Sequence, residues 1–174
     1  MAEASRHEGD HYFAGSVRMA TVYLPLLCVA DAQVSATAAI DATKLEHQHN
    51  IAYGQANAAA VDETRVIYVC RGATGTVMAV KAGSIAAAVG DANCTVDVKK
   101  NGTTILTAPI TLDSSNAAYT PEAGTVSVSG LVAGDVLTVV IDGTINPDAT
   151  TTTSGAEAMP TGVYVEVVVH EDAA

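Results

Sequence analysis

Residues 95–143 consist of short runs in which hydrophobic and polar residues alternate, with turn residues between the runs. Val96 and Val98 alternate with polar residues before Asn101-Gly102, and apolar residues resume after this pair. Asn-Gly between β-forming residues is a strong hairpin signal, because both turn residues tolerate a positive φ. The pattern therefore predicts a tight turn over residues 99–104.

Other parts of the chain carry the same kind of pattern, and Pro109 ends the second arm of the predicted hairpin. Further strands are predicted at residues 65–70, 76–80, 84–89, 125–129, 135–141 and 162–169. This gives about eight strands at a spacing of roughly 8 to 12 residues, which is typical of sandwiches and barrels. We expect an all-β fold, an antiparallel β-sandwich of jelly-roll-like type. Residues 65–70 and 163–169 should lie near the sheet centres, because they are the most continuously β-forming runs.

Residues 1–52 differ from the rest and predict an extended N-terminal arm with short elements, followed by a sandwich domain over residues 53–174. Pro25 interrupts the apolar part of this arm, and no long helical period follows. A short arm cannot shield its own apolar side chains, so they should lie on the chain's own sandwich or on a neighbouring subunit. These side chains are Val22, Leu24, Leu26 and Leu27. Residues 146–160, with four consecutive Thr, predict a polar loop between two strands.

Charge is distributed unevenly along the sequence. All eight Lys and Arg lie at or before Lys100, where ten acids leave a net charge of −2, and the remaining residues carry −9. Binding of nucleic acid needs clustered basic residues that displace counterions, so we expect no nucleic-acid partner. The 49% of hydrophobic residues suffices for a core, but one Phe and no Trp leave its volume to aliphatic side chains.

The cysteines Cys28, Cys70 and Cys94 are odd in number and lack metal-binding spacing, so they predict neither a disulfide framework nor a zinc site. The first ten residues lack the layout of a signal peptide, and no apolar run reaches the roughly 18 residues of a membrane span. We therefore expect synthesis and folding in a cytoplasm, with no membrane partner.

Two segments have the residue types of a metal site. His7-Glu8-Gly9-Asp10-His11 matches a metalloprotease pattern, but this match lies near the N-terminus, carries Gly-Asp at its centre and follows no helix signal. His47 and His49 would lie on one face of a strand, where copies around a trimer axis could bind a metal. We favour polar contacts at the junction of arm and domain for this pair. No nucleophile elbow or phosphate loop is present, so we expect no enzyme activity and no cofactor.

Several short segments of the sequence resemble head decoration (cement) proteins of tailed bacteriophages. They lie at residues 41–49, 69–76, 96–102 and 133–137, and the resemblance spans most of residues 10–170. Phrases similar to Lys100-Asn101-Gly102 and Gly134-Asp135-Val136-Leu137 also occur in phage fibre and receptor-binding modules with jelly-roll folds. The resemblance implies a β-sandwich on the outer capsid face, often a trimer, whose arms cross neighbouring capsid subunits.

The expected function is therefore that of a non-enzymatic virion protein, made in a host bacterial cytoplasm, that stabilises a capsid by bridging major capsid subunits. The alternative is a head-fibre or receptor-binding module that recognises host glycans. A homo-oligomer is expected, with a trimer favoured. Contacts to capsid or subunits are expected from Val22, Leu24, Leu26, Leu27, Lys44, Leu45, His47 and His49. The acidic half should face away from packaged DNA.

Overall fold

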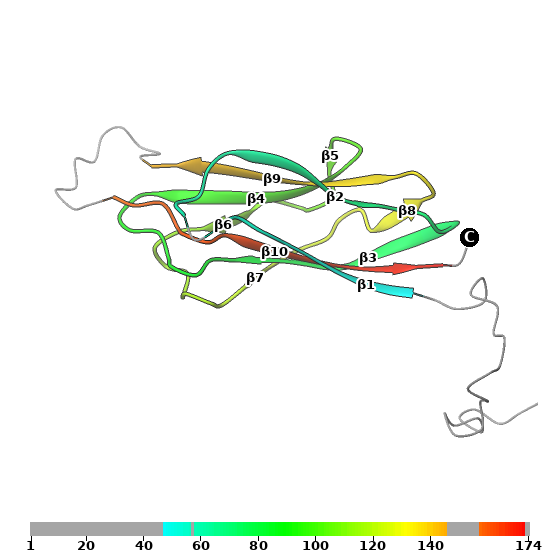
Figure 1. The fold of residues 1–174 in the computed structure, drawn as a ribbon, viewed down its shortest axis with the longest axis horizontal. Coiled ribbons are helices and arrows are strands. Elements are labelled where there is room, and N and C mark those ends of the chain that lie inside the picture. Colours follow the sequence, from blue (N-terminus) through cyan, green and yellow to red (C-terminus); the bar gives the residue numbers. More distant parts are fainter. Residues whose placement is uncertain (1–46, 57, 146–156, 173–174) are drawn as a thin grey trace, which may run out of the picture. The chain divides into compact units, whose positions relative to one another are not determined.

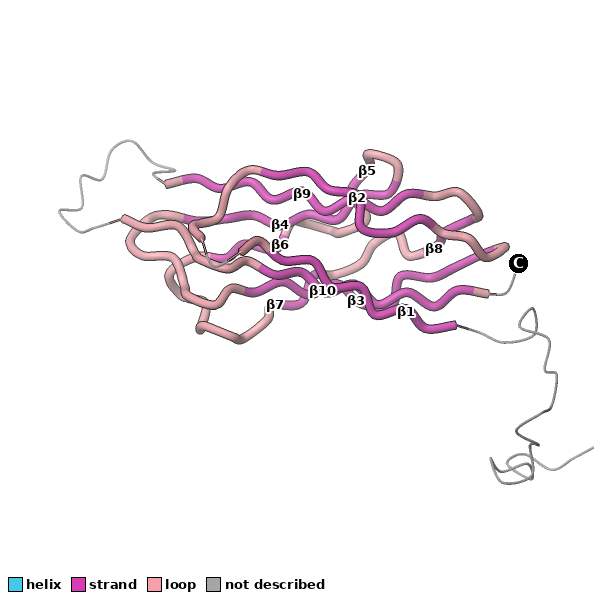
Figure 2. Tube along the Cα trace, viewed as in Figure 1, coloured by secondary structure: helices cyan, strands magenta, loops and turns pink. Residues whose placement is uncertain are grey.

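The computed structural model describes residues 47–56, 58–145 and 157–172, which form two antiparallel β-sheets packed as a sandwich (Figures 1 and 2). One sheet contains β1 (His47–Gly54), β10 (Tyr164–Glu171), β3 (Thr74–Gly83), β7 (Glu122–Gly124) and β8 (Gly130–Val132). The other contains β2 (Glu63–Val69), β9 (Val136–Thr144), β4 (Asn93–Lys100), β5 (Thr103–Thr104) and β6 (Ile110–Leu112). The predicted all-β antiparallel sandwich is confirmed.

The strands pair in a nested order that makes this sandwich a jelly roll. β1 pairs with β10, β2 with β9, β3 with β7 and β8, and β4 with β5 and β6. The chain therefore behaves as one long antiparallel hairpin that is wrapped into two sheets. Neighbouring strands of each sheet are mostly far apart in sequence, so most strand pairings bring together distant parts of the chain.

The tip of the wrapped hairpin is the predicted tight turn. Asn101 has a φ of 50° and Gly102 a φ of 86°, and Lys99 pairs with Thr104 across them. The Asn101 side chain also fixes the tip to the neighbouring turn, because its Nδ2 donates to Asp135 at 2.7 Å. Asn101 thus fills two roles, since an Asn tolerates the left-handed conformation and offers an amide to a neighbour.

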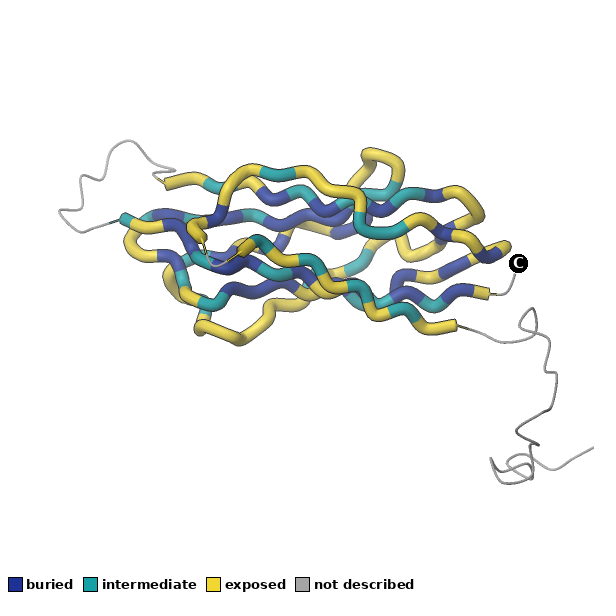
Figure 3. Tube along the Cα trace, viewed as in Figure 1, coloured by how far each residue is buried: buried dark blue, intermediate teal, exposed yellow. Residues whose placement is uncertain are grey.

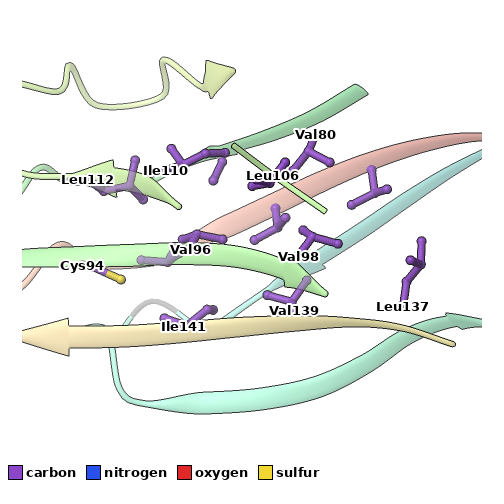
Figure 4. Close-up of a cluster of buried hydrophobic side chains, with 14 of the residues drawn as sticks. Val80, Cys94, Val96, Val98, Leu106, Ile110, Leu112, Leu137, Val139 and Ile141 are labelled. Carbon is purple, nitrogen blue, oxygen red and sulfur yellow. The ribbon is translucent and has the colours of Figure 1, made fainter. Parts of the chain in front are cut away.

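The core lies between the sheets and is built from aliphatic side chains (Figures 3 and 4). Burial alternates along β9, where Leu137, Val139 and Ile141 are buried, and the same alternation runs along β10. Cys70 and Cys94 are buried free thiols, and burial raises the pKa of Cys94 to about 11. At neutral pH Cys94 is therefore a neutral apolar side chain of the core.

Two predicted strands are wrong. Residues 84–92 form a loop whose Ala86 makes only an isolated bridge with Thr161, while β3 continues instead to Gly83. This loop is rich in Ala, which has low β-propensity. Residues 125–129 cross between the sheets, because the Ser127 N–H donates to Ile105 and the Ser129 carbonyl accepts from Val77. A segment that changes sheets cannot keep one partner strand.

The prediction for sheet centres is right for one run and wrong for the other. β10 lies between β1 and β3, as expected for residues 163–169. β2, predicted at residues 65–70, is instead an outer strand, and none of its residues is buried. A continuous apolar run also suits an outer strand whose exposed face is apolar, which is the case here.

Two boundaries of the sequence interpretation change. β1 begins at His47, so residues 47–52, assigned to the arm, belong to the first sheet. Four consecutive polar residues at its start, 47–50, hid this strand, because its pairing with β10 depends on backbone hydrogen bonds. Of the predicted loop at residues 146–160, the part over 146–156 lies outside the described residues, and Ala158 bridges Val89. No helix among the described residues is long and apolar enough to cross a membrane.

Connections differ between the two ends of the sandwich. At one end, here called the short-turn end, strands are joined by residues 70–73, 101–102 and 133–135. The chain also enters β1 at this end and leaves β10 there, since His47 is paired with Glu171. The long-loop end carries the connections at residues 55–62, 84–92, 113–121 and 145–163.

Acidic side chains are more concentrated at one of these ends than at the other. Because the strands run the length of the sandwich, acids from both halves of the sequence meet at the long-loop end, namely Asp62, Glu63, Asp91, Asp113, Glu122, Asp142 and Glu157. At the short-turn end, Arg71, Lys99 and Lys100 are balanced by Asp135, Glu171 and Asp172. The excess of acids is therefore concentrated at the long-loop end of the fold, rather than in one half of the sequence.

Candidate functional site

The outer strands β1 and β2 lie on one side of the sandwich, where their side chains meet across the gap between the sheets. Tyr53 of β1 hydrogen-bonds to Glu63 of β2, and the ring of His49 lies 5.6 Å from that of Tyr68, centroid to centroid. We call this surface the β1–β2 side. Among the described residues, each of these two strands pairs with only one neighbour, so each has a free backbone edge here.

A polar cluster lies on the part of the β1–β2 side that is nearer the long-loop end. The Tyr53 hydroxyl and the Arg65 Nε, at 2.9 Å, both donate to the Glu63 carboxylate. The Arg65 guanidinium also lies 5.3 Å from the Tyr53 ring centroid, a cation–π distance. The hydrogen bonds from Tyr53 and Gln55 lower the pKa of Glu63, and burial raises the pKa of Tyr53. The cluster joins the two outer strands by side chains alone.

A second cluster surrounds Glu171 at the short-turn end. Its carboxylate accepts the backbone N–H groups of Arg71 and Gly72, and its Oε2 lies 2.9 Å from the His49 Nε2. Burial raises the pKa of Glu171, but the hydrogen bonds from the Gly72 and Arg71 N–H groups contribute to lowering it, and the pKa is about 2. Glu171 is therefore a fixed negative charge that holds the β2–β3 turn.

An apolar pocket of about 570 Å³ opens beside this second cluster. It is lined by His49, Val66, Ile67, Tyr68, Val69, Arg71 and Glu171. Val66 is 57% exposed and Val69 is 39% exposed, so the second half of β2 presents aliphatic carbon to its surroundings. Such a surface next to a free strand edge suits contact with another polypeptide segment better than chemistry.

The structure places two of the eight sequence-predicted contact residues. His47 and His49 lie on β1 with ring centroids 6.5 Å apart, and His49 lines the apolar pocket. The other six, Val22, Leu24, Leu26, Leu27, Lys44 and Leu45, lie outside the described residues, as does the segment from His7 to His11. Among the residues that are described, no group of three or more His, Cys, Asp or Glu is placed to hold a metal ion.

Sequence reasoning missed the residues that give this side its character, which are Glu171, Tyr68, Val66 and Val69. Glu63 and Arg65 at the start of β2 are a signal that could have identified an outer strand, because charged residues are common on sheet edges. Nothing in the sequence pointed to Glu171, whose partner Gly72 is 99 residues away.

Comparison of the chain with protein-family models and with curated proteins finds no match.

Proposed function

We propose that the chain is a non-enzymatic structural protein of a bacteriophage virion, which decorates the capsid and stabilises it by bridging major capsid subunits. The short sequence segments that resemble phage head decoration proteins support this class of function. The jelly-roll topology is compatible with it, because a rigid sandwich presents a surface without needing a reaction centre.

One structural observation supports this proposal most directly. The chain enters the sandwich at His47, at the end that also carries the apolar pocket of the β1–β2 side. His49 of β1 and the exposed Val66 and Val69 line this pocket together, so they can act as one contact region. Its area can add to the interface between neighbouring capsid subunits, which stabilises the assembled state by mass action.

The distribution of charge supports an orientation on the particle. The described bases and acids balance at the short-turn end, so this end can approach an acidic capsid surface more easily than the acidic long-loop end, which is well solvated when it points outward. This orientation replaces the simpler expectation that the C-terminal half of the sequence faces outward. Bridging in this orientation would leave the long loops free of capsid contacts.

Particles that lack the protein test the proposal. They should assemble but release DNA at lower temperature or on osmotic shock, and added purified protein should restore the wild-type release temperature. Electron microscopy of the restored particles should show density bridging adjacent capsid subunits. Stripped particles with unchanged thermal stability would contradict the proposal.

One observation favours the alternative, a module that recognises host glycans. Tyr119, in a connection at the long-loop end, is 71% exposed and has a φ of 59°, which a non-glycine residue rarely adopts. A strained backbone that presents an aromatic ring is a feature of binding loops, and aromatic rings stack on sugars. If stripped particles keep their stability but lose attachment to cells, and Tyr119→Ala protein fails to restore attachment, this alternative takes precedence.

A further inference from the structure

The hairpin tip between β4 and β5 carries a chemically labile pair, Asn101-Gly102. Of the asparagines in the chain, Asn101 alone precedes a glycine, and both residues of the pair are exposed. Glycine lacks a Cβ, so its backbone nitrogen can approach the side chain of the residue before it. A Cβ added to Gly102 would meet no atom within 4 Å, so the space around the pair is open. Asn101 is therefore the asparagine of this chain best suited to deamidation, the reaction that makes asparagine thermolabile.

Deamidation at this pair needs only water. The backbone nitrogen of Gly102 gives up its proton to water or hydroxide and attacks the side-chain carbonyl carbon of Asn101. The bond from that carbon to Nδ2 breaks, and the nitrogen takes a proton from water and leaves as ammonia. One water molecule then opens the five-membered succinimide at either of its two carbonyl groups. The products are aspartate or isoaspartate at position 101, with one water consumed and one ammonia released.

Two hydrogen bonds fix the Asn101 side-chain amide in the folded protein. Its Nδ2 donates to the Asp135 Oδ1 at 2.7 Å, and its Oδ1 accepts from the Val136 N–H at 2.9 Å. Asp135 is itself held in place, because it is buried and its Oδ2 accepts the Val132 N–H at 2.9 Å. Formation of the succinimide has to swing the amide towards the Gly102 nitrogen, which breaks both bonds of the side chain. The folded tip therefore slows the reaction.

We propose that Asn101 is a deamidation site protected by Asp135 and Val136, and that the reaction proceeds when the hairpin tip opens. Turns open locally far more often than a whole domain unfolds. The pairing that has to break here is short, because β5 consists of Thr103 and Thr104 alone. Each opening thus gives the pair a chance to react, and the product is an irreversible covalent record of it.

The product cannot restore the protected tip. A carboxylate at position 101 has no N–H to donate to Asp135 and places a second negative charge beside it. The hydrogen bonds from the Val132 N–H and the Asn101 side chain lower the pKa of Asp135, so Asp135 is ionised at neutral pH. Lys100, whose Nζ lies 3.8 Å from the Asp135 Oδ2, can balance only one of the two charges. Isoaspartate also adds a methylene group to the backbone of a two-residue turn, which disturbs the pairing of β4 with β5.

Deamidation should therefore loosen the short-turn end and add one negative charge to it. This inference concerns the free protein and does not depend on the capsid role. If that role also holds, the modified end should approach an acidic capsid surface less easily.

Peptide mapping by mass spectrometry tests the site in the full chain. The folded protein and the protein unfolded in guanidinium chloride are incubated in parallel at mildly alkaline pH, and a synthetic peptide of residues 98–104 corrects for the effect of the solvent. We expect conversion of Asn101 in the unfolded chain, and at least roughly tenfold slower conversion in the folded chain. Asn116, which precedes an alanine, is the internal reference and should convert more slowly than Asn101 in the unfolded chain. Equal corrected rates in the two states, or no conversion of Asn101 in either, would overturn the proposal.

Two variants test whether the local contact gives the protection. Asp135→Ala removes the acceptor of the Asn101 amide and should raise the rate of conversion in the folded chain by roughly tenfold. Asp113→Ala is the matched control, because Asp113 also holds a turn, accepting the Ser115 N–H at 2.7 Å, but at the long-loop end. It should leave the rate at Asn101 unchanged. Equal acceleration by both substitutions, or none by either, would overturn the role of Asp135.

A measurement on the wild type keeps the proposal testable if Asp135→Ala does not fold. The Asn101 N–H donates to the Val136 carbonyl at 2.9 Å, so hydrogen exchange at this amide reports opening of the tip. Across a series of guanidinium chloride concentrations below the unfolding transition, exchange at Asn101 and its deamidation should accelerate by the same factor. Deamidation that stays constant while exchange accelerates would contradict the coupling of the reaction to opening.

Discussion

The carboxylate of Glu171, on the last strand, accepts the backbone N–H of Gly72, in the turn that connects β2 to β3. A Cβ added to Gly72 would lie 2.0 Å from the Asp172 carbonyl oxygen, so the turn also packs directly against the end of β10. This contact joins the two sheets at the short-turn end through one buried charge. It therefore links the stability of the sandwich to the geometry of the candidate contact surface.

Removing this charge should destabilise the sandwich. Glu171→Ala leaves the N–H groups of Arg71 and Gly72 without their acceptor, and we expect unfolding to become easier by about 1.5–3 kcal/mol. Urea denaturation of the full chain measures this. Glu166→Ala is the matched control, because Glu166 is an exposed acid on the same strand, and its effect should stay within about 0.5 kcal/mol. Equal effects of the two substitutions would contradict the assigned role.

The same carboxyl group should make stability depend on pH in the acid range. Its pKa is about 2 in the folded protein against an ordinary value of 4.5, so the ionised form is favoured by folding. Its contribution is complete above pH 4.5 and is lost as the pH falls towards 2. The urea midpoint of the wild type should therefore fall more steeply across this window than that of Glu171→Gln. Parallel curves would show that Glu171 does not carry the effect.

A substitution of Gly102 at the hairpin tip should lower the free energy of unfolding through backbone strain alone. Gly102 has a φ of 86°, and a Cβ there would meet no atom within 4 Å, so Gly102→Ala introduces strain without a clash. We expect a loss of roughly 1–2 kcal/mol in the free energy of unfolding. Gly130→Ala is the control, since Gly130 has equal open space but no positive φ. A neutral Gly102→Ala would mean that the turn adopts another conformation.

Truncation should show whether the N-terminal arm is needed for capsid binding rather than for folding. Because β1 begins at His47, deletion of residues 1–40 should leave a sandwich with wild-type circular dichroism, but one that binds stripped capsids poorly. Deletion of residues 1–54 should prevent folding or lower the melting temperature strongly, because it exposes the whole edge of β10. Full capsid occupancy by the shorter deletion would argue against a role for the arm in capsid binding.

Sequence patterns identified the elements whose local chemistry is unambiguous. The Asn101-Gly102 turn was predictable because only a few residues tolerate its backbone angles. β9 and β10 were predictable because they are β-forming runs that begin or end at turn residues. The outer position of β2 was not, since Val66-Ile67-Tyr68-Val69 could equally cover a core or remain exposed. β1 was missed because its place is set by backbone pairing with β10, more than 100 residues later.

The candidate site was predictable only in part. A strand was considered for His47 and His49 only as the condition for a metal site, and β1 does place both on one strand with ring centroids 6.5 Å apart. Their neighbours Tyr68 and Glu171 come from a different sheet and from the far end of the chain, so no local pattern links them. A contact surface formed by two outer strands emerges only when the order of strands in both sheets is known.

The pairing of β1 with β10 also dictates when the sandwich can form during synthesis. A ribosome adds about 5–20 residues per second, so β1 waits roughly 5–20 seconds for its partner strand. Until then, the buried faces of β4 and β9 in the second sheet have no completed first sheet to pack against. Nascent chains should therefore depend on chaperones, and a premature stop codon before Tyr164 should yield no folded product at all.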